Sequence, residues 1–423
     1  MNNNTKTEKL SSILFVISAL MILFAPYHAN STLSLHTNIL NYLFRVAIYT
    51  FMLINAALII FKYRRKKIDN LLQVLPMIIY FLFASLHTYD NNIVLSGLLF
   101  FLLWILYALA PQKIKLLTFK YLKKAWIIIS LMGIICYLNY YLKLFIPYKI
   151  VPYYDLTNLT VSKNYIDYKI IFLYRESIPG YSSDFIRLCG ICNEPGFFGV
   201  ACALFLCSNN LNLKKKTDIV LLLGGILTFS LAFIIIIVLF FFLKNLKNIK
   251  TISITIIFVL LYIFALPNIK TGNQSIDTLL KRMVITKDGL SGDDRSNYGI
   301  DYIYENTLKN KPLFGYGMGY LNTFTFESGY STYKAYIIQY GILGCALIWG
   351  TLLLAALYKN TKNLNIVNYI IVFFLNIYAS PNVMVIQREI ILFGGILFIQ
   401  EYSNVNNAAI KEKNKDREVL LEN

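Results

Sequence analysis

The sequence contains little charge for its length. Only 15% of its 423 residues are Asp, Glu, Lys or Arg, whereas 57% are apolar. A water-soluble globule of this size does not need so many apolar residues to fill its core, so the surplus must face lipid. Apolar stretches of about 20 residues, enough to cross a hydrocarbon layer, recur from one end of the sequence to the other. These proportions exclude a set of soluble domains and predict one membrane domain.

Acidic residues and histidines are also scarce. The chain has 22 Asp and Glu against 40 Lys and Arg, a formal net charge of +18, and only three His. In a soluble protein this charge would favour a nucleic-acid partner, but most of the cations lie in short connectors between apolar segments. We therefore interpret them as topology signals and expect no nucleic acid. His28, His36 and His87 do not cluster with the arginine-bearing segments, so a Ser-His-Asp or histidine-metal site is not expected.

Metal-binding patterns are weak as well. Among six cysteines, Cys189 and Cys192 form a CxxC, but no second pair lies nearby and no thioredoxin-like strand and helix context surrounds it. The adjacent pair Asp293 and Asp294 lacks a convincing set of further oxygen ligands. We expect neither a metal nor another cofactor.

Hydropathy predicts an all-α polytopic membrane protein. It consists of one transmembrane domain, 1–402, and a cytoplasmic tail, 403–423, with one ambiguous apolar run at 219–243. The other expected spans lie near 10–25, 41–61, 71–87, 92–110, 125–142, 190–207, 252–266, 335–358, 365–380 and 389–401.

Lysine and arginine set the predicted orientation. The connectors 62–70, 111–124 and 208–218 carry five, five and three Lys or Arg, so they are expected on the cytoplasmic side. The alternate connectors 26–40 and 88–91 carry none, which places them outside together with the long loop 143–189 and leaves the amino terminus inside.

The run 219–243 decides the remaining topology. One long helix would put Lys244, Lys247 and Lys250 outside and the loop 267–334 inside, against the charge rule. Two short segments that break near Thr228–Ser230 return those lysines to the inside, place the loop 267–334 outside and keep the carboxyl terminus cytoplasmic. We expect a short or re-entrant pair, about twelve segments in all, and two long outer loops. A single tilted helix is the alternative.

The first loop ends in a cluster of polar residues before an apolar run. Arg175 and Arg187 precede Asn193-Glu194-Pro195, which reads as a helix cap followed by the first helical position. A helix from Pro195 leaves about 15 residues, roughly 22 Å, before the next connector, so Glu194 is expected in a cavity below the outer surface. The alternative is that Glu194 only caps its helix or pairs with Arg187.

The second loop carries Arg282 and Arg295 among several acids, followed by the glycine-rich segment GYGMGY. Guanidinium groups suit phosphate oxygens, and the aromatic residues of both loops suit sugar faces. A solvated surface loop is the alternative. GYGMGY lacks the spacing and the strand-to-helix setting of a dinucleotide-binding fingerprint.

These segments resemble the O-antigen polymerase and ligase superfamily, which acts on lipid-linked sugars at the outer face of the bacterial inner membrane. The resemblance covers roughly residues 170–350 and rests on RLCGICNEPGFFGVACALFL, LLLGGILTFSLAFIIII, DDRSNYGIDYIYENTLKNKPLFGYGMGY and YIIQYGILG, in the family's order. It implies a membrane glycosyltransferase of GT-C-like class that is metal-independent, inverting, and uses an undecaprenyl diphosphate-linked donor.

The resemblance also implies residue roles. Arg187, Arg282 and Arg295 would face the diphosphate, with Arg175 and Asn193 as further substrate contacts and Glu194 as the base near the acceptor. Ligases of the group place a His-Asn pair before YIIQYGILG, but this chain reads SGYSTYKAY there. The expected function is therefore polymerisation of O-antigen, capsular or exopolysaccharide repeats, with a chain-length regulator and a flippase as implied partners. A ligase, a lipid-linked oligosaccharide flippase or a structural membrane protein are the alternatives.

Overall fold

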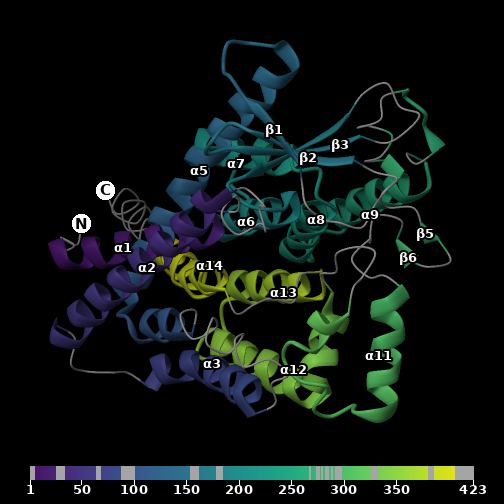
Figure 1. Cartoon of the computed structure of the whole chain (residues 1–423). Coiled ribbons are helices and arrows are strands. Elements are labelled where there is room, and N and C mark those ends of the chain that lie inside the picture. Colours follow the sequence, from purple (N-terminus) through teal and green to yellow (C-terminus); the bar gives the residue numbers. More distant parts are fainter. Residues whose placement is uncertain are drawn as a thin grey trace, which may run out of the picture.

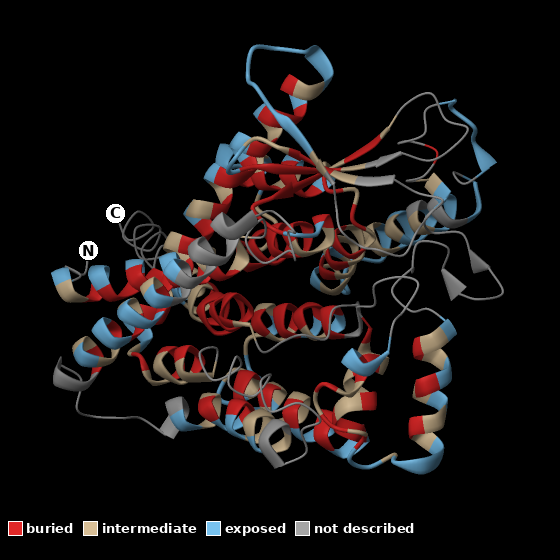
Figure 2. Ribbon diagram, viewed as in Figure 1, coloured by how far each residue is buried: buried red, intermediate tan, exposed pale blue. Residues whose placement is uncertain are grey.

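The chain is mostly helical. The computed structural model describes residues 5–24, 34–62, 68–86, 101–152, 162–177, 184–265, 268–272, 277, 280–281, 285–286, 289–290, 298–324, 332–379 and 385–404. Figure 1 places α11 and the β5–β6 hairpin at the opposite end of the molecule from α1. Figure 2 shows that α6, α13 and α14 are the most buried helices, so the core lies between the two ends.

Helices occupy the apolar segments that hydropathy predicts. A further helical stretch covers 101–109 within the expected span 92–110, whose beginning lies outside the described residues. Among the described residues, α5 and α12 are long and apolar enough to cross a membrane. The bounds are α1 Lys6–Leu23, α2 Ser34–Lys62, α3 Ile68–Leu86, α5 Gln112–Leu142, α6 Pro195–Ser208, α7 Lys216–Ile226, α8 Leu231–Lys244, α9 Ile249–Phe264, α11 Tyr298–Asn310, η3 Tyr320–Thr323, α12 Tyr333–Leu357, α13 Leu364–Ala379, α14 Ile386–Glu389 and η4 Ile390–Gly394.

The apolar run 219–243 is broken, as its flanking lysines predict. Helix α7 ends at Ile226 and α8 begins at Leu231, where the Ser230 hydroxyl accepts the backbone N–H of Phe233 as an N-cap. At the far end of α8, Lys244 Nζ donates to the carbonyl of Asn210 at 2.8 Å. The pair therefore returns to the connector from which it started, and the single long helix is excluded.

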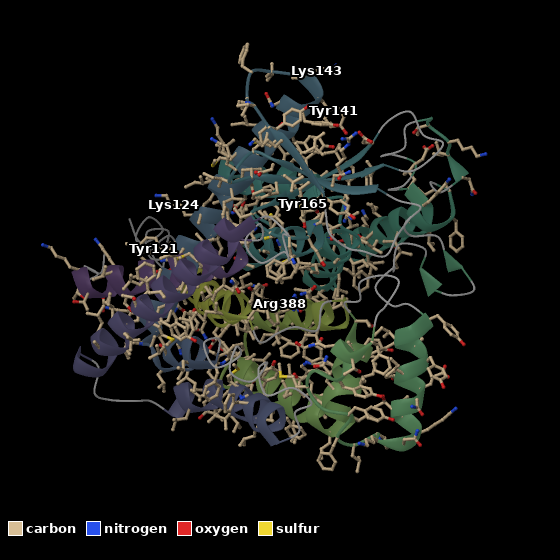
Figure 3. All side chains as sticks on the ribbon, viewed as in Figure 1. Tyr121, Lys124, Tyr141, Lys143, Tyr165 and Arg388 are labelled. Carbon is tan, nitrogen blue, oxygen red and sulfur yellow. The ribbon has the colours of Figure 1, made fainter. Side chains whose placement is uncertain are left out.

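Two of the expected inner connectors, 111–124 and 208–218, lie side by side. Lys123 forms an ion pair with Asp218 at 3.2 Å, and Lys120 forms one with Glu401 at 2.5 Å. These contacts join the beginning of α5, the connector 208–218 and the end of the last helix, which covers 395–404. Figure 3 shows Lys124 on the same side of the molecule as α1.

The connector 111–124 differs from a solvated loop because it is part of α5. Lys115 is fully buried, and its ammonium donates to Gln73 Oε1 at 2.5 Å and to the carbonyl of Ala108 at 2.7 Å. A buried ammonium needs such acceptors, since an unpaired charge in an apolar interior is very costly. Some of the predicted topology signals are therefore also part of the packing.

The segment 143–189, which the charges place outside and which is here called the first outer segment, contains a sheet that an all-α fold does not include. Strands β1 Lys149–Pro152, β2 Ser162–Asp167, β3 Phe172–Ser177 and β4 Phe185–Gly190 form an antiparallel sheet in that order. Along β4 the side chains of Ile186 and Leu188 point to one face and those of Phe185, Arg187 and Cys189 to the other. The first face packs on α5: a Cβ built at Gly133 would lie 2.7 Å from Leu188 Cδ1.

The described part 298–324 of the loop 267–334, here called the second outer segment because the charges place it outside, docks on a break in α12. Gly341 has φ +67°, which interrupts the helix, and the freed N–H of Ile342 donates to the carbonyl of Pro312 at 2.8 Å. In the opposite direction, the N–H of Tyr316 donates to the carbonyl of Ile338 at 2.7 Å. A Cβ at Gly315 would lie 2.5 Å from that same carbonyl oxygen. The glycine at the start of GYGMGY therefore permits this close backbone approach.

A substitution at Gly199 can test how closely α6 packs against the break between α7 and α8. A Cβ there would lie 2.6 Å from Thr228 Oγ1 and 3.1 Å from Ser230 Cβ, whereas a Cβ at Gly350 in α12 meets nothing within 4 Å. We expect Gly199→Ala to lower the free energy of unfolding by about 1–3 kcal/mol through overpacking. Gly350→Ala should leave it unchanged or raise it by up to about 1 kcal/mol, because alanine favours a helix. Thermal unfolding in detergent measures both, and equal melting temperatures would contradict the packing.

Candidate functional site

Arg187 joins the sheet to the helix break. It lies on β4 opposite Tyr174 of β3, and its guanidinium carbon lies 5.9 Å from the Tyr174 ring centroid and 5.7 Å from that of Phe185. Its Nε donates to the carbonyl of Thr228 at 3.0 Å. A helix break leaves such carbonyls without their intrahelical donors. The arginine singled out from the sequence therefore has a structural task in addition to its charge.

The turn after β4 sets the start of α6. The Tyr165 hydroxyl donates to the carbonyl of Asn193 at 2.6 Å, and Pro195 is buried at the first helical position. The helix begins at Pro195 as predicted and has 14 residues, about 21 Å of length. Its positive end favours an anion nearby.

Glu194 is the N-cap residue of α6, but its side chain makes no capping hydrogen bond. Capping by the carboxylate therefore does not explain its presence. Among the described residues, both Asn193 and Glu194 are exposed, whereas the sequence placed Glu194 in a cavity. The difference arises because Tyr165 holds the turn and Pro195 packs inward, so the two cap residues face outward.

Arg175 does not join this group. It neighbours Tyr174 on β3 and therefore points to the opposite face of the sheet from Arg187. Its Nε forms an ion pair with Asp184 Oδ2 at 2.7 Å, and the Tyr140 hydroxyl donates to the same oxygen at 3.4 Å. This arrangement fastens the sheet to the end of α5.

The second arginine pair, Arg282 and Arg295, lies outside the described residues. Of the acids that follow them, Asp301 on α11 pairs with Lys334 on α12 at 2.7 Å. This ion pair and the contacts at Gly341 hold the second outer segment to α12.

Sequence reasoning missed Arg388. This residue lies in α14, is only 5% exposed, and places its guanidinium carbon 5.4 Å from the ring centroid of Phe197. Phe197 is in the first turn of α6, three residues after Glu194. Figure 3 shows Arg388 in the middle of the molecule.

The residues around Arg388 mark the place as unusual. Its neighbours Gln387 and Glu389 are buried too, and a π-helix, η4, follows immediately. Within the described chain, neither carboxylate oxygen of Glu389 has a hydrogen-bond partner. Three consecutive polar residues at the edge of an apolar run are the signal that could have found this site, because ionisable groups in such segments are usually functional.

The cysteines behave as packing residues. All six, including Cys189 and Cys192, are buried and free, and the described residues contain no group of three or more metal-ligating side chains. Burial raises the pKa of the Cys189 thiol well above its usual range, although the positive charge of Arg187 opposes this shift. The thiolate, which is the reactive form, is therefore scarce at neutral pH.

We expect the native cysteines to resist maleimide at neutral pH in the folded protein and to react after denaturation. A Tyr298→Cys variant is the control, because Tyr298 is 86% exposed and should give one reactive thiol. Mass spectrometry of the labelled protein counts the adducts. Rapid modification of Cys189 or Cys192 in the native state would show that the CxxC is accessible and would contradict their packing role.

Comparison of the chain with models of protein families, with curated proteins and with solved structures gives no match.

Proposed function

We propose that the chain is a multi-pass membrane glycosyltransferase that polymerises undecaprenyl diphosphate-linked oligosaccharide repeats into O-antigen, capsular or exopolysaccharide chains. The observation that carries this proposal is that three ionisable side chains lie near the first turns of α6. Glu194 is its N-cap residue, Arg388 packs on Phe197, and Arg187 bonds to the carbonyl of Thr228, whose hydroxyl lies close to Gly199. The enzyme would work at the outer face of the bacterial cytoplasmic membrane, with both termini cytoplasmic.

Exposed apolar side chains support the membrane placement. Ile249 and Ile254 on α9 are 78% and 67% exposed, and Leu53 on α2 and Leu354 on α12 are 69% and 67% exposed. Soluble monomers rarely expose large continuous apolar patches. A bilayer around about twelve segments, with α7 and α8 as a short pair, would cover these surfaces.

The broken helices support a binding site near the outer end. Non-helical backbone at membrane depth is tolerated where protein covers it or where it lines a site, and discontinuous helices often point their ends at a substrate. Both breaks are covered by outer segments: the one between α7 and α8 by β4, and the one in α12 by the segment 312–317. A lipid-linked sugar would reach this region from the outer leaflet.

We assign the donor diphosphate to the guanidinium groups. Arg388 lies against the first turn of α6, whose positive end also favours an anion, and Arg187 lies at the break between α7 and α8. Arg282 and Arg295 would join them from the second outer segment. Tyr174 and Tyr165 lie on the same face of the sheet as Arg187, where both are buried and the Tyr174 ring supports the guanidinium. Asn193 would contact the substrate at the turn, and Arg175 would only hold the sheet through Asp184.

The reaction needs one base and a stabilised leaving group. A hydroxyl oxygen of the acceptor sugar attacks the anomeric carbon of the donor, and the bond from that carbon to the diphosphate oxygen breaks. The electron pair leaves with the diphosphate, whose charge the arginines stabilise without a general acid. The hydroxyl proton passes to the Glu194 carboxylate, which faces outward and is free of a capping hydrogen bond.

The test uses a strain lacking the gene, complemented by single variants. Glu194→Gln should reduce polymerisation by about 10²–10⁴-fold, as expected for loss of a general base. Arg388→Gln should reduce it by about 10²–10³-fold, as expected for loss of one charge-stabilising donor. Lys149→Gln is the control, because it removes an exposed cation from β1 of the same sheet. Gel separation of surface polysaccharide reports the distribution of chain lengths.

The form of the lipid-linked sugar that accumulates, and the leaflet on which it accumulates, discriminate between a polymerase, a flippase and a ligase. A polymerase defect leaves single lipid-linked repeats on the outer leaflet, whereas a flippase defect leaves them on the inner leaflet. Ligase loss would leave long chains on the lipid carrier. A full ladder of chain lengths in both variants, with normal protein levels in the membrane, would contradict the proposed site.

A further inference from the structure

An open surface cavity of about 560 Å³ lies at the end of the molecule where the α7–α8 pair returns. The connector residues 210–214, the end of α8 at Lys244 and Tyr402 of the last helix line it. This volume falls within the range of sites for small ligands or headgroups. It is at the opposite end of the α7–α8 pair from Arg187, so it is separate from the proposed catalytic site.

Hydrogen bonds hold the walls of this cavity. Lys244 Nζ donates to the carbonyl of Asn210 at 2.8 Å, and the Asn212 amide donates to the Tyr402 hydroxyl at 3.4 Å. The side-chain oxygen of Asn212, Oδ1, also accepts a hydrogen bond from the backbone N–H of Lys214 at 3.2 Å. Three separate parts of the chain are therefore fixed around one opening.

The lining is cationic. It includes Lys214 and Lys244, both exposed, and no carboxylate. Two described acids close in sequence to the lining are engaged in ion pairs: Asp218 pairs with Lys123, and Glu401 pairs with Lys120. The cavity therefore presents two ammonium groups, an amide and a hydroxyl to a ligand, which suits a phosphate that carries a hydroxylated substituent.

Apolar residues border the same opening. Leu211 and Leu213 line the cavity, and Leu213 is 41% exposed. Leu246, two residues after Lys244, is 49% exposed. Cationic pockets beside membrane helices on the cytoplasmic side are suited to anionic lipid headgroups. Given the membrane placement proposed above, acyl chains would lie against these side chains.

We propose that this cavity binds the headgroup of an anionic phospholipid of the inner leaflet, of the phosphatidylglycerol type. The phosphate lies between Lys214 and Lys244, and the glycerol hydroxyls face Asn212 and Tyr402. Because Lys244 ends α8 and Asn210 precedes α7, the lipid clamps the open ends of the broken pair. Its binding thereby steadies the helix break that Arg187 contacts at the other end.

The experiment uses the purified full chain in nanodiscs of phosphatidylcholine with or without a minor fraction of phosphatidylglycerol. Native mass spectrometry counts retained lipids, and thermal unfolding reports stabilisation. We expect phosphatidylglycerol to be retained and to raise the melting temperature. The double variant Lys214→Gln/Lys244→Gln should weaken retention by about 30-fold, from about fivefold per lysine.

The control is Lys247→Gln/Lys250→Gln, which removes the same charge from exposed positions outside the cavity. It should retain phosphatidylglycerol like the parent chain. Lys214→Gln alone keeps the Lys244 hydrogen bond and should still weaken retention about fivefold. Unchanged retention in Lys214→Gln, or an equal loss in the control, would overturn the proposal.

Displacement of the lipid by soluble glycerol phosphate, with no stabilisation by phosphatidylglycerol itself, would also overturn it in favour of a soluble anion. The glycosyltransferase proposal does not depend on this outcome. If the protein polymerises oligosaccharide repeats in phosphatidylcholine nanodiscs that lack phosphatidylglycerol, the glycosyltransferase proposal stands whatever the outcome for the lipid site.

Discussion

The backbone groups released at two helix breaks constrain the rest of the structure. Between α7 and α8, the carbonyl of Leu227 accepts the N–H of Leu188 at 2.8 Å, and that of Thr228 accepts Arg187 Nε at 3.0 Å. In α12, the N–H groups that follow Gly341 donate to the segment 312–317. A buried polar group left without a partner lowers the free energy of unfolding by about 1–3 kcal/mol, so displacing these hydrogen-bond partners would destabilise the fold. Each outer segment is thus fastened to one broken helix.

This constraint explains how the candidate site is held. The strand β4 satisfies the break and also leads directly into the turn that ends at Glu194, so the break, the sheet and the start of α6 form one unit. Arg187 is part of that unit through its hydrogen bond, while Arg388 approaches it from the core through Phe197. Rigid placement of charge is what a site for a diphosphate leaving group requires, because preorganised groups need no rearrangement as the charge develops.

The sequence allowed the helices and the break at 219–243 to be predicted because long apolar runs and lysine placement are strong local signals. The sheet was not predicted, although the alternation in FLYRES and FIRLCG, with its aromatic and branched residues, is typical of strands. The start of α6 and the cap position of Glu194 follow from the Pro195 pattern. The exposure of Glu194 does not, because it depends on Tyr165, which is 29 residues away in the sequence. Arg388 could have been suspected from its apolar surroundings, but its contact with α6 is a tertiary feature that no local pattern contains.

The central claim is that the segment 219–243 reverses, so that both outer segments and the start of α6 share one side of the membrane. Cysteine labelling tests it directly, because all six native cysteines are buried. Phe145→Cys, at a position 96% exposed beside β1, should react with an impermeant maleimide in intact spheroplasts. Lys247→Cys, in the exposed segment after α8, should react only after the membrane is opened. Labelling of Lys247→Cys in intact spheroplasts would contradict the account.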